Sequence, residues 1–137
     1  METPLSPSIA PLGKGFLTGR IKSLSDISHP MLRTFPRFLP ENFDNNLKLV
    51  TEIEKLAAKK GCTSGQIAIN WVRALSDKPG MPKIIPIPGS TSAERVKENS
   101  KIIELTGEDL AEIDAILASF KPIGDRYPAQ LQRFVDV

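Results

Sequence analysis

The sequence has very few of the residues from which metal sites and acid–base machinery are usually built. Cys62 is the only cysteine, His29 the only histidine and Tyr127 the only tyrosine. A single cysteine excludes an internal disulfide and a cysteine-rich zinc site, and it makes a reducing, cytoplasmic setting the expected one. The shortage of histidine and tyrosine also limits the acid–base chemistry that one chain can perform. We therefore predict no metal site.

Neither charge nor hydropathy marks the chain for nucleic acid or a membrane. The 18 basic and 16 acidic residues are interspersed and give a formal net charge of +2, with no block of like charge. No apolar run approaches the roughly 18 residues needed to cross a bilayer, and the first residues lack the features of a secretion signal. We expect one globular domain with no nucleic-acid or membrane partner.

Most of the irregular structure is expected near the N-terminus. Prolines and glycines punctuate residues 1–15, which predicts irregular chain with at most a short extended piece near residues 8–10. Residues 22–40 are polar and interrupted by prolines, which predicts a long loop. We divide the chain into an irregular leader at residues 1–10, a main segment at residues 11–127 and a tail at residues 128–137.

Two stretches have the pattern of helices. Apolar residues recur at three- and four-residue spacing over residues 42–60, and Gly61 stands where a helix C-cap is expected. Thr63 and Gln66 match a capping box, which predicts a second helix over residues 64–76. This second helix is apolar around much of its circumference, so neighbours should pack on more than one of its sides.

One strand and two further helices are predicted in the second half. Residues 83–87 form a short apolar run rich in isoleucine, which favours a buried strand. Thr91 with Glu94 matches a capping box for a helix that runs to about Ile103, and a last helix is expected over residues 106–120. A lone strand leaves backbone groups unpaired on both edges. The element order therefore predicts a parallel α/β protein with part of its sheet missing.

The segment IPIPGSTSAERVKEN, residues 85–99, carries the most specific functional signal. A strand ends there in a loop that opens a helix, and the unpaired N–H groups and dipole of a helix N-terminus favour an anion. Arg95 lies about one turn into this helix, where its guanidinium can form a forked pair with a phosphate. Glu98 and Asn99 provide an acceptor and an amide that can bind the edge of a purine.

This segment resembles the loop and helix that follow the eighth barrel strand of the aldo-keto reductases. In that family the loop and an arginine hold the 2′-phosphate of NADP, and a Glu-Asn pair faces the adenine. Gly89 departs from the subfamilies that have a lysine at its position. The resemblance implies NADP(H) as the cofactor, with its adenosine phosphate end bound by Gly89, Ser90, Thr91, Ser92, Arg95, Glu98 and Asn99.

A second match lies upstream, in the segment PLGKGFLTG at residues 11–19. It is similar to the family's loop after strand seven, where glycines let the backbone approach the cofactor's pyrophosphate closely. The resemblance implies that Leu12, Gly13 and Gly15 contact the cofactor. Ile9 stands where the family has a tyrosine that stacks on the nicotinamide, and Ala10 stands in place of a serine.

The resemblance runs over residues 11–127 and is greatest to the pyridoxal reductase-like and auxin-induced reductase-like subgroup. It implies an NADP-dependent oxidoreductase and a partial (β/α)8 barrel, from about strand seven onward, that is predominantly helical in this chain. The irregular leader at residues 1–10 is expected to stand in place of strand seven. The family's catalytic Asp, Tyr, Lys and His lie on early barrel strands, and a complete barrel needs about 250 residues. Tyr127 and His29 match none of these positions. We expect no catalytic residues here, nicotinamide dinucleotide binding, and carbonyl reduction only if the missing half is present.

A different class of function stays open for the same sequence. With part of the sheet missing, the sheet-facing surfaces of the helices would be exposed apolar faces, and such faces favour association. The alternative is therefore a non-catalytic interaction module, or a helical fragment that self-associates. The response of the chain's size and stability to NADP separates the two functions.

Overall fold

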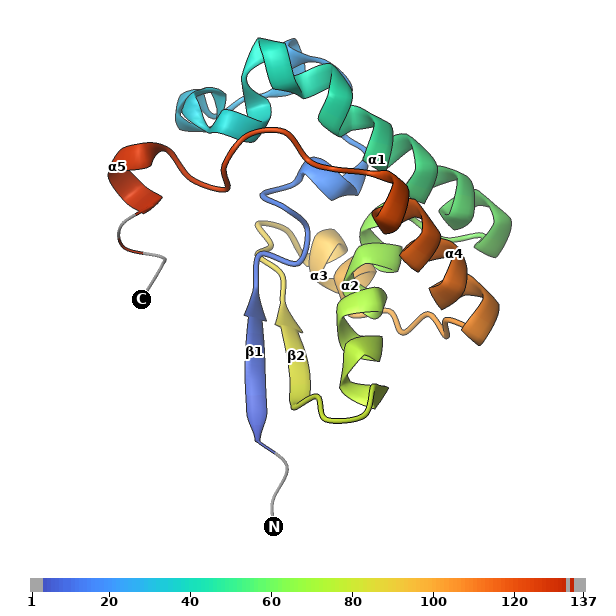
Figure 1. Ribbon diagram of the computed structural model, residues 1–137. Helices are drawn as coiled ribbons and strands as arrows, with labels where there is room; N and C mark the ends of the chain where they lie inside the picture. The colour runs from blue at the N-terminus through green and yellow to red at the C-terminus, as the bar shows by residue number, and fades with distance from the viewer. Residues whose placement is uncertain (1–3, 133, 135–137) are drawn as a thin grey trace.

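The computed structural model describes residues 4–132 and residue 134, and it shows a two-stranded parallel sheet flanked by helices (Figure 1). Strand β1 (Leu5–Ile9) lies beside strand β2 (Lys83–Ile87), in register from Leu5 opposite Lys83 to Ile9 opposite Ile87. Helix α2 packs against β2. The predicted α/β class, rich in helix, is confirmed.

Strand β1 contradicts the expectation of irregular chain before Pro11, whereas β2 has the predicted bounds. The sequence pattern misses β1 because Pro7 stands in its middle. In the structure, Lys83 N donates to the Pro4 carbonyl at 2.9 Å, so residues 4, 6 and 8 direct their backbone groups toward β2. Pro7 therefore faces the open edge, where its missing N–H costs no ladder hydrogen bond.

The outer edge of β2 is occupied by a side chain. The Ser76 hydroxyl accepts a hydrogen bond from Ile84 N at 2.8 Å and donates to the Ile84 carbonyl at 3.3 Å. Pro86 lies two residues further along, so it faces the same edge and has no N–H to leave unpaired. Each of the two edges of the sheet thus has a proline facing outward.

The two predicted long helices form, with small shifts at their ends. Helix α1 (Pro40–Lys60) begins at a proline, which fits the first helical position, and Gly61 ends it with a φ of 64°. Helix α2 (Ser64–Ala74) opens with the predicted capping box, in which Thr63 and Gln66 bind each other's backbone N–H groups. A 3-10 turn, Leu75–Asp77, continues the chain beyond α2.

Helix α3 (Ala93–Asn99) is shorter than predicted and has a different cap. The predicted capping box of Thr91 and Glu94 is wrong, because Ser92 is the N-cap and its Oγ accepts from Arg95 N at 3.3 Å.

The predicted continuation of α3 to Ile103 is also wrong. Side chains of α2 bind carbonyl groups at the end of α3 and just beyond it. Gln66 Nε2 donates to the Glu98 carbonyl at 3.0 Å, and Asn70 Nδ2 donates to the Lys101 carbonyl at 3.1 Å. These acceptors belong to the last turn of α3 and to the extended chain that follows, so the tertiary contacts fix where the helix ends.

Helix α4 (Gly107–Ser119) forms as predicted and docks on α1. Thr106 and Asp109 form its capping box, and Asp109 Oδ2 also accepts from Lys60 Nζ at 2.6 Å. The contact with Lys60 holds the pKa of the Asp109 carboxyl below its usual 3.8, against the opposing effect of burial. A last single-turn helix, α5 (Ala129–Gln132), lies in the predicted tail.

Two clusters of buried side chains form the core. The first joins α1, α2 and α4, and its buried members are Ile53, Leu56, Ala57, Ile67 and Ile113. The second lies within the first 43 residues and consists of Ile27, Phe35, Phe38 and Phe43. Phe16 packs edge-on against Phe38 and Phe43, with ring-centre distances of 5.2 and 5.6 Å. The predicted long loop is therefore a series of 3-10 turns with a core of its own, namely Leu24–Asp26, Pro30–Thr34 and Pro36–Phe38.

The chain after α4 crosses the start of α1 as an extended strap (Figure 1). The buried Asn46 side chain holds it: Nδ2 donates to the Ile123 carbonyl and Oδ1 accepts from Ile123 N, each at 2.8 Å. Gly124 follows with a φ of 92°, and a Cβ there would lie 2.7 Å from the carbonyl carbon of Pro36. Only glycine fits this approach without a shift of the backbone.

In the part of the chain that the structure describes, none of the helices combines the length and apolar character required to span a bilayer. The same residues include no group of three or more histidine, cysteine, aspartate or glutamate side chains that could hold a metal ion.

Gly124→Ala is expected to lower the free energy of unfolding by about 2–3 kcal/mol, because it adds a backbone clash to the strain of a left-handed residue. Gly80→Ala is the matched control: Gly80 has a φ of 80° and nothing within 4 Å of an added Cβ. The control should cost only about 1 kcal/mol. Urea unfolding measures both, and equal losses would show that the strap yields at Pro36 without cost.

Asp109→Asn is expected to lower the free energy of unfolding at pH 7 by up to about 1 kcal/mol. The folded pKa of Asp109 is depressed, so its contribution is complete above the unfolded pKa and is lost as the pH falls through the folded pKa. The difference between variant and wild type should therefore narrow below pH 3.8. Asp114→Asn on the same helix, with Lys78 3.8 Å away, is the control, and a difference for Asp109→Asn that is constant with pH would contradict the assignment.

Candidate cofactor-binding site

A cleft of about 470 Å³ lies between the turn that follows β1 and the loop and helix that follow β2. Both segments singled out in the sequence, residues 11–19 and 85–99, contribute to its walls. The predicted site residues that line it are Leu12, Gly15, Gly89, Arg95, Glu98 and Asn99. The other four, Gly13, Ser90, Thr91 and Ser92, lie beside these in the chain but do not line the cleft.

The turn after β1 has a backbone that depends on its glycines. Gly13, Lys14 and Gly15 have left-handed φ angles of 57°, 58° and 90°. The amides of the two glycines donate within the turn, to the carbonyls of Ala10 and Leu12 at 3.0 and 3.1 Å. Within residues 4–132, the amides of Leu12 and Lys14 have no hydrogen-bond partner. These two amides, and not those of the glycines, are thus the donors that the turn leaves for a ligand.

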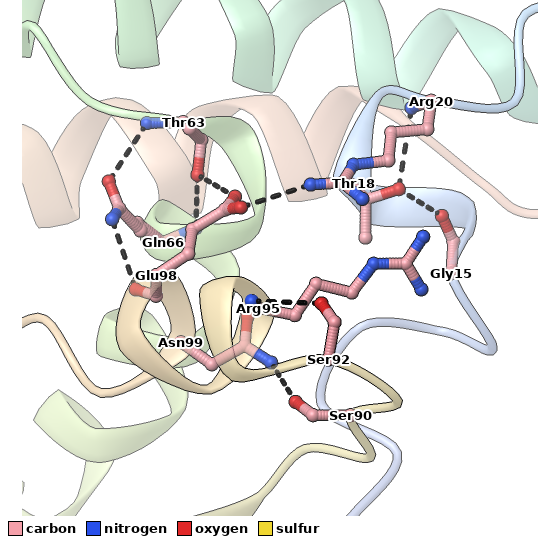
Figure 2. Close-up of polar contacts among 10 residues, drawn as sticks. All are labelled: Gly15, Thr18, Arg20, Thr63, Gln66, Ser90, Ser92, Arg95, Glu98 and Asn99. Carbon is pink, nitrogen blue, oxygen red and sulfur yellow. Dashed lines mark hydrogen bonds and ion pairs between the residues drawn. The ribbon is translucent and has the colours of Figure 1, made fainter.

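Helix α3 and the loop before it form the opposite wall. Asn99 Nδ2 donates to Ser90 Oγ at 2.9 Å, which ties the loop to the end of the helix. Arg95 lines the cleft, and its exposed guanidinium forms no ion pair or hydrogen bond with any residue that the structure describes. Figure 2 shows its side chain extending from α3 toward Gly15. Arg95 is therefore available to bind an anion in the cleft.

Glu98 is bound more extensively than the other site residues (Figure 2). Its Oε1 accepts from Thr63 Oγ1 and its Oε2 from Arg20 Nη2, both at 3.0 Å. Its carbonyl also accepts from the Gln66 side chain. Both carboxylate oxygens therefore already have partners within the protein.

Sequence reasoning missed two cationic residues that line the cleft, Lys14 and Arg20. Lys14 Nζ lies 4.1 Å from the ring centre of Tyr127 and 4.9 Å from that of Phe35, as in cation–π contacts. Lys14 could have been identified from its place inside the glycine turn. Arg20 is one of 18 basic residues, and only its position next to Gly19 distinguishes it in the sequence.

The charges that line the cleft favour an anion. Three cationic side chains face two carboxylates, since Asp26 and Glu98 are the acidic residues of the lining. The Asp26 carboxylate accepts hydrogen bonds from Lys22 N, then from the hydroxyl and the N–H of Ser23, and these bonds lower its pKa. Asp26 therefore stays charged while bound to its own turn, and the lining is net positive.

The lone histidine and tyrosine have structural partners. His29 caps a 3-10 turn by accepting a hydrogen bond from Met31 N at 3.3 Å. Tyr127 packs on Phe35 with a ring-centre distance of 5.8 Å. Ile9, at the position of the family's stacking tyrosine, belongs to β1, and its side chain lies outside the described part of the structure.

The family model, the similar sequences and the similar solved structure all agree on the kind of protein that this chain resembles. The sequence model of the Aldo/keto reductase family matches residues 7–118. Two proteins of Schizosaccharomyces pombe are similar: "Aldo-keto reductase yakc [NADP(+)]" is 39% identical over 122 residues, and "Probable pyridoxal reductase 2" is 33% identical over 135 residues. Among solved structures, the glycerol dehydrogenase of Gluconobacter oxydans has a TM-score of 0.64 and 29% identity.

These matches cover most of this chain but a smaller part of each relative. They include 87% and 93% of the chain for the two yeast proteins and 88% for the glycerol dehydrogenase. The chain spans 34% and 39% of the length of the yeast proteins and 37% of the dehydrogenase chain. Since the family model matches most of its 137 residues, the chain belongs to the aldo/keto reductase family.

Proposed function

We propose that this chain supplies the cofactor-binding portion of an NADP(H)-dependent aldo/keto reductase. The observation that carries the proposal is that both predicted segments, residues 11–19 and 85–99, line the same cleft, and that the charges of this lining are net positive. Its size suits part of a dinucleotide, since ligand pockets commonly measure about 300–1,000 Å³. When bound, NADPH supplies the hydride for carbonyl reduction.

The proposed phosphate contacts favour NADP(H) over NAD(H). Arg95 lines the cleft, and its guanidinium has no ion-pair partner among the described residues. A 2′-phosphate could therefore form a charge-assisted hydrogen bond with Arg95 and no ion pair within the protein would have to break. Ser90, Thr91 and Ser92 do not line the cleft, but they are exposed and precede Arg95 in the chain, and their hydroxyls are proposed to complete the contact. One of the yeast relatives carries NADP(+) in its name, which supports this choice.

The remaining proposed contacts follow the two walls. The pyrophosphate would lie along the turn of Gly13 and Gly15, where the amides of Leu12 and Lys14 are available. The adenine would lie at the end of α3, near Asn99 and Glu98.

We further propose that the chain corresponds to the barrel from strand seven onward, with β1 and β2 as strands seven and eight. Parallel neighbouring strands followed by cofactor-facing loops fit that place in a (β/α)8 barrel. On this proposal β1 takes the place of strand seven where an irregular leader was expected, residues 11–127 form the reductase segment and residues 128–137 the tail. His29 and Tyr127 are bound in structural roles. We therefore propose that the chain alone reduces no carbonyl. We also propose a cytoplasmic location.

Calorimetric titration of the chain with NADPH and NADH tests the phosphate contact. Arg95→Gln is expected to weaken NADPH binding about tenfold or more, because it removes a charge-assisted pair, and to leave NADH binding unchanged. Lys97→Gln is the matched control, because Lys97 is an exposed cation of the same helix that does not line the cleft. Failure of the wild type to bind NADPH, or equal losses in both variants, would refute the proposed site.

A second candidate function, a self-associating module, is favoured by one apolar face of the sheet. Leu5, Ile85 and Ile87 are 69%, 46% and 49% exposed. Leu5 and Ile85 come from adjacent strands and share a face with Ile87 by the alternation of side chains. An exposed apolar face of this kind marks a surface for association.

Size-exclusion chromatography with and without NADP discriminates between the two functions. A monomer whose melting temperature rises with NADP supports the cofactor-binding portion. An oligomer whose size and melting temperature do not change with NADP supports the second candidate. Ile87→Lys should then convert this oligomer to a monomer, because it places a charge on the apolar face. Ile102→Lys, at a residue that is 62% exposed and lies outside the sheet, is the control and should leave the oligomer intact.

A further inference from the structure

The glycine turn after β1, residues 12–15, contains one residue whose type disfavours its conformation. Lys14 has a φ of 58° and lies between Gly13 and Gly15. A Cβ makes a left-handed φ unfavourable, whereas glycine adopts it readily. The amides of Leu12 and Lys14, which the turn leaves for a ligand, keep their direction only while the turn stays in this conformation. The contacts of the Lys14 side chain therefore bear on the shape of the turn.

The Lys14 ammonium lies against two aromatic rings. Its Nζ is 4.1 Å from the ring centre of Tyr127 and 4.9 Å from that of Phe35. The two ring centres are 5.8 Å apart, and the ring planes meet at 55°. A cation at such distances is attracted to the negative face of a ring. None of the ion pairs among the described residues includes Lys14, so the rings are the charged group's documented partners.

Both rings are attached to the body of the domain independently of the turn. Tyr127 belongs to the strap after α4, in which the buried Asn46 side chain binds the N–H and the carbonyl of Ile123. Phe35 is 5% exposed and is a member of the second core cluster. The rings are therefore fixed supports, and Lys14 is the side chain through which the turn is attached to them.

We propose that Tyr127 is a positioning residue for cofactor binding: its ring holds Lys14 in the left-handed conformation that presents the amides of the turn to the pyrophosphate. The proposal rests on the proposed cofactor site. It gives the strap after α4 a part in nucleotide affinity, although Tyr127 does not line the cleft. The contact uses the face of the ring and not the hydroxyl, so phenylalanine should replace tyrosine here and leucine should not.

Hydrogen exchange in the free full chain tests the contact without any nucleotide. Tyr127→Leu should speed exchange of the Gly13 and Gly15 amides, which are hydrogen-bonded within the turn, by about two- to fivefold. Lys14→Met removes the charge and should do the same, and the double variant should add nothing further. Tyr127→Phe keeps the ring and should exchange as the wild type does.

Two controls separate the ring contact from a general loosening of the strap. The Ile123 amide, which donates to Asn46 Oδ1, should keep its wild-type exchange in Tyr127→Leu. Phe120→Leu removes a different ring, at the C-cap of α4, and should leave the turn unchanged. Unchanged exchange of the turn in Tyr127→Leu, an equal effect of Tyr127→Phe, or an equal acceleration at Ile123 overturns the proposal.

Calorimetric titration gives the second test. Tyr127→Leu should weaken binding of NADPH and of NADH by the same factor, about two- to fivefold, because the two nucleotides share the pyrophosphate. Arg95→Gln, in contrast, is expected to act on NADPH alone. Tyr127→Phe should bind both nucleotides as the wild type does. No loss in Tyr127→Leu, or a loss for NADPH alone, overturns the positioning role. Failure of the wild type to bind NADPH would instead refute the proposed function, and the exchange experiment would still decide whether Tyr127 holds the turn.

Discussion

The parallel pairing of β1 and β2 is the constraint on which the candidate site depends. Because the strands run in the same direction and in register from Leu5 opposite Lys83, their carboxyl ends lie at the same end of the sheet. The glycine turn and the serine-rich loop leave the strands there and become the two walls of one cleft. Ligands of parallel α/β proteins commonly bind at this end. Without the pairing, the two segments would be separate surface loops.

The sequence predicts well the features that depend on neighbouring residues. The capping box at Thr63 and the C-cap at Gly61 each involve residues within a few positions of one another, and both are present in the structure. The bounds of β2 are also recovered, because its apolar run is continuous. The family resemblance, read from two short motifs, is confirmed by the family model and by the yeast relatives.

Features that depend on distant partners were not predictable in the same way. Whether Pro7 breaks a strand or lies on an open edge depends on Lys83, whose N–H fixes which residues face the partner. The end of α3 depends on amide side chains of α2, and the bond between Arg20 and Glu98 joins residues with no common motif. Six of the ten proposed contact residues line the cleft, but their roles in binding stay predictions.

The outward-facing prolines, Pro7 and Pro86, affect whether molecules in solution aggregate through the edges of their sheets. A strand from another molecule that approached β1 would meet Pro7 at its centre, and on β2 it would meet Pro86 and an Ile84 already bound by Ser76. Each edge therefore offers an interrupted row of donors, which disfavours the continuous ladder by which exposed strands seed fibrils. The edges of the two-stranded sheet that the structure describes thus disfavour amyloid-like growth, even though its apolar face is open.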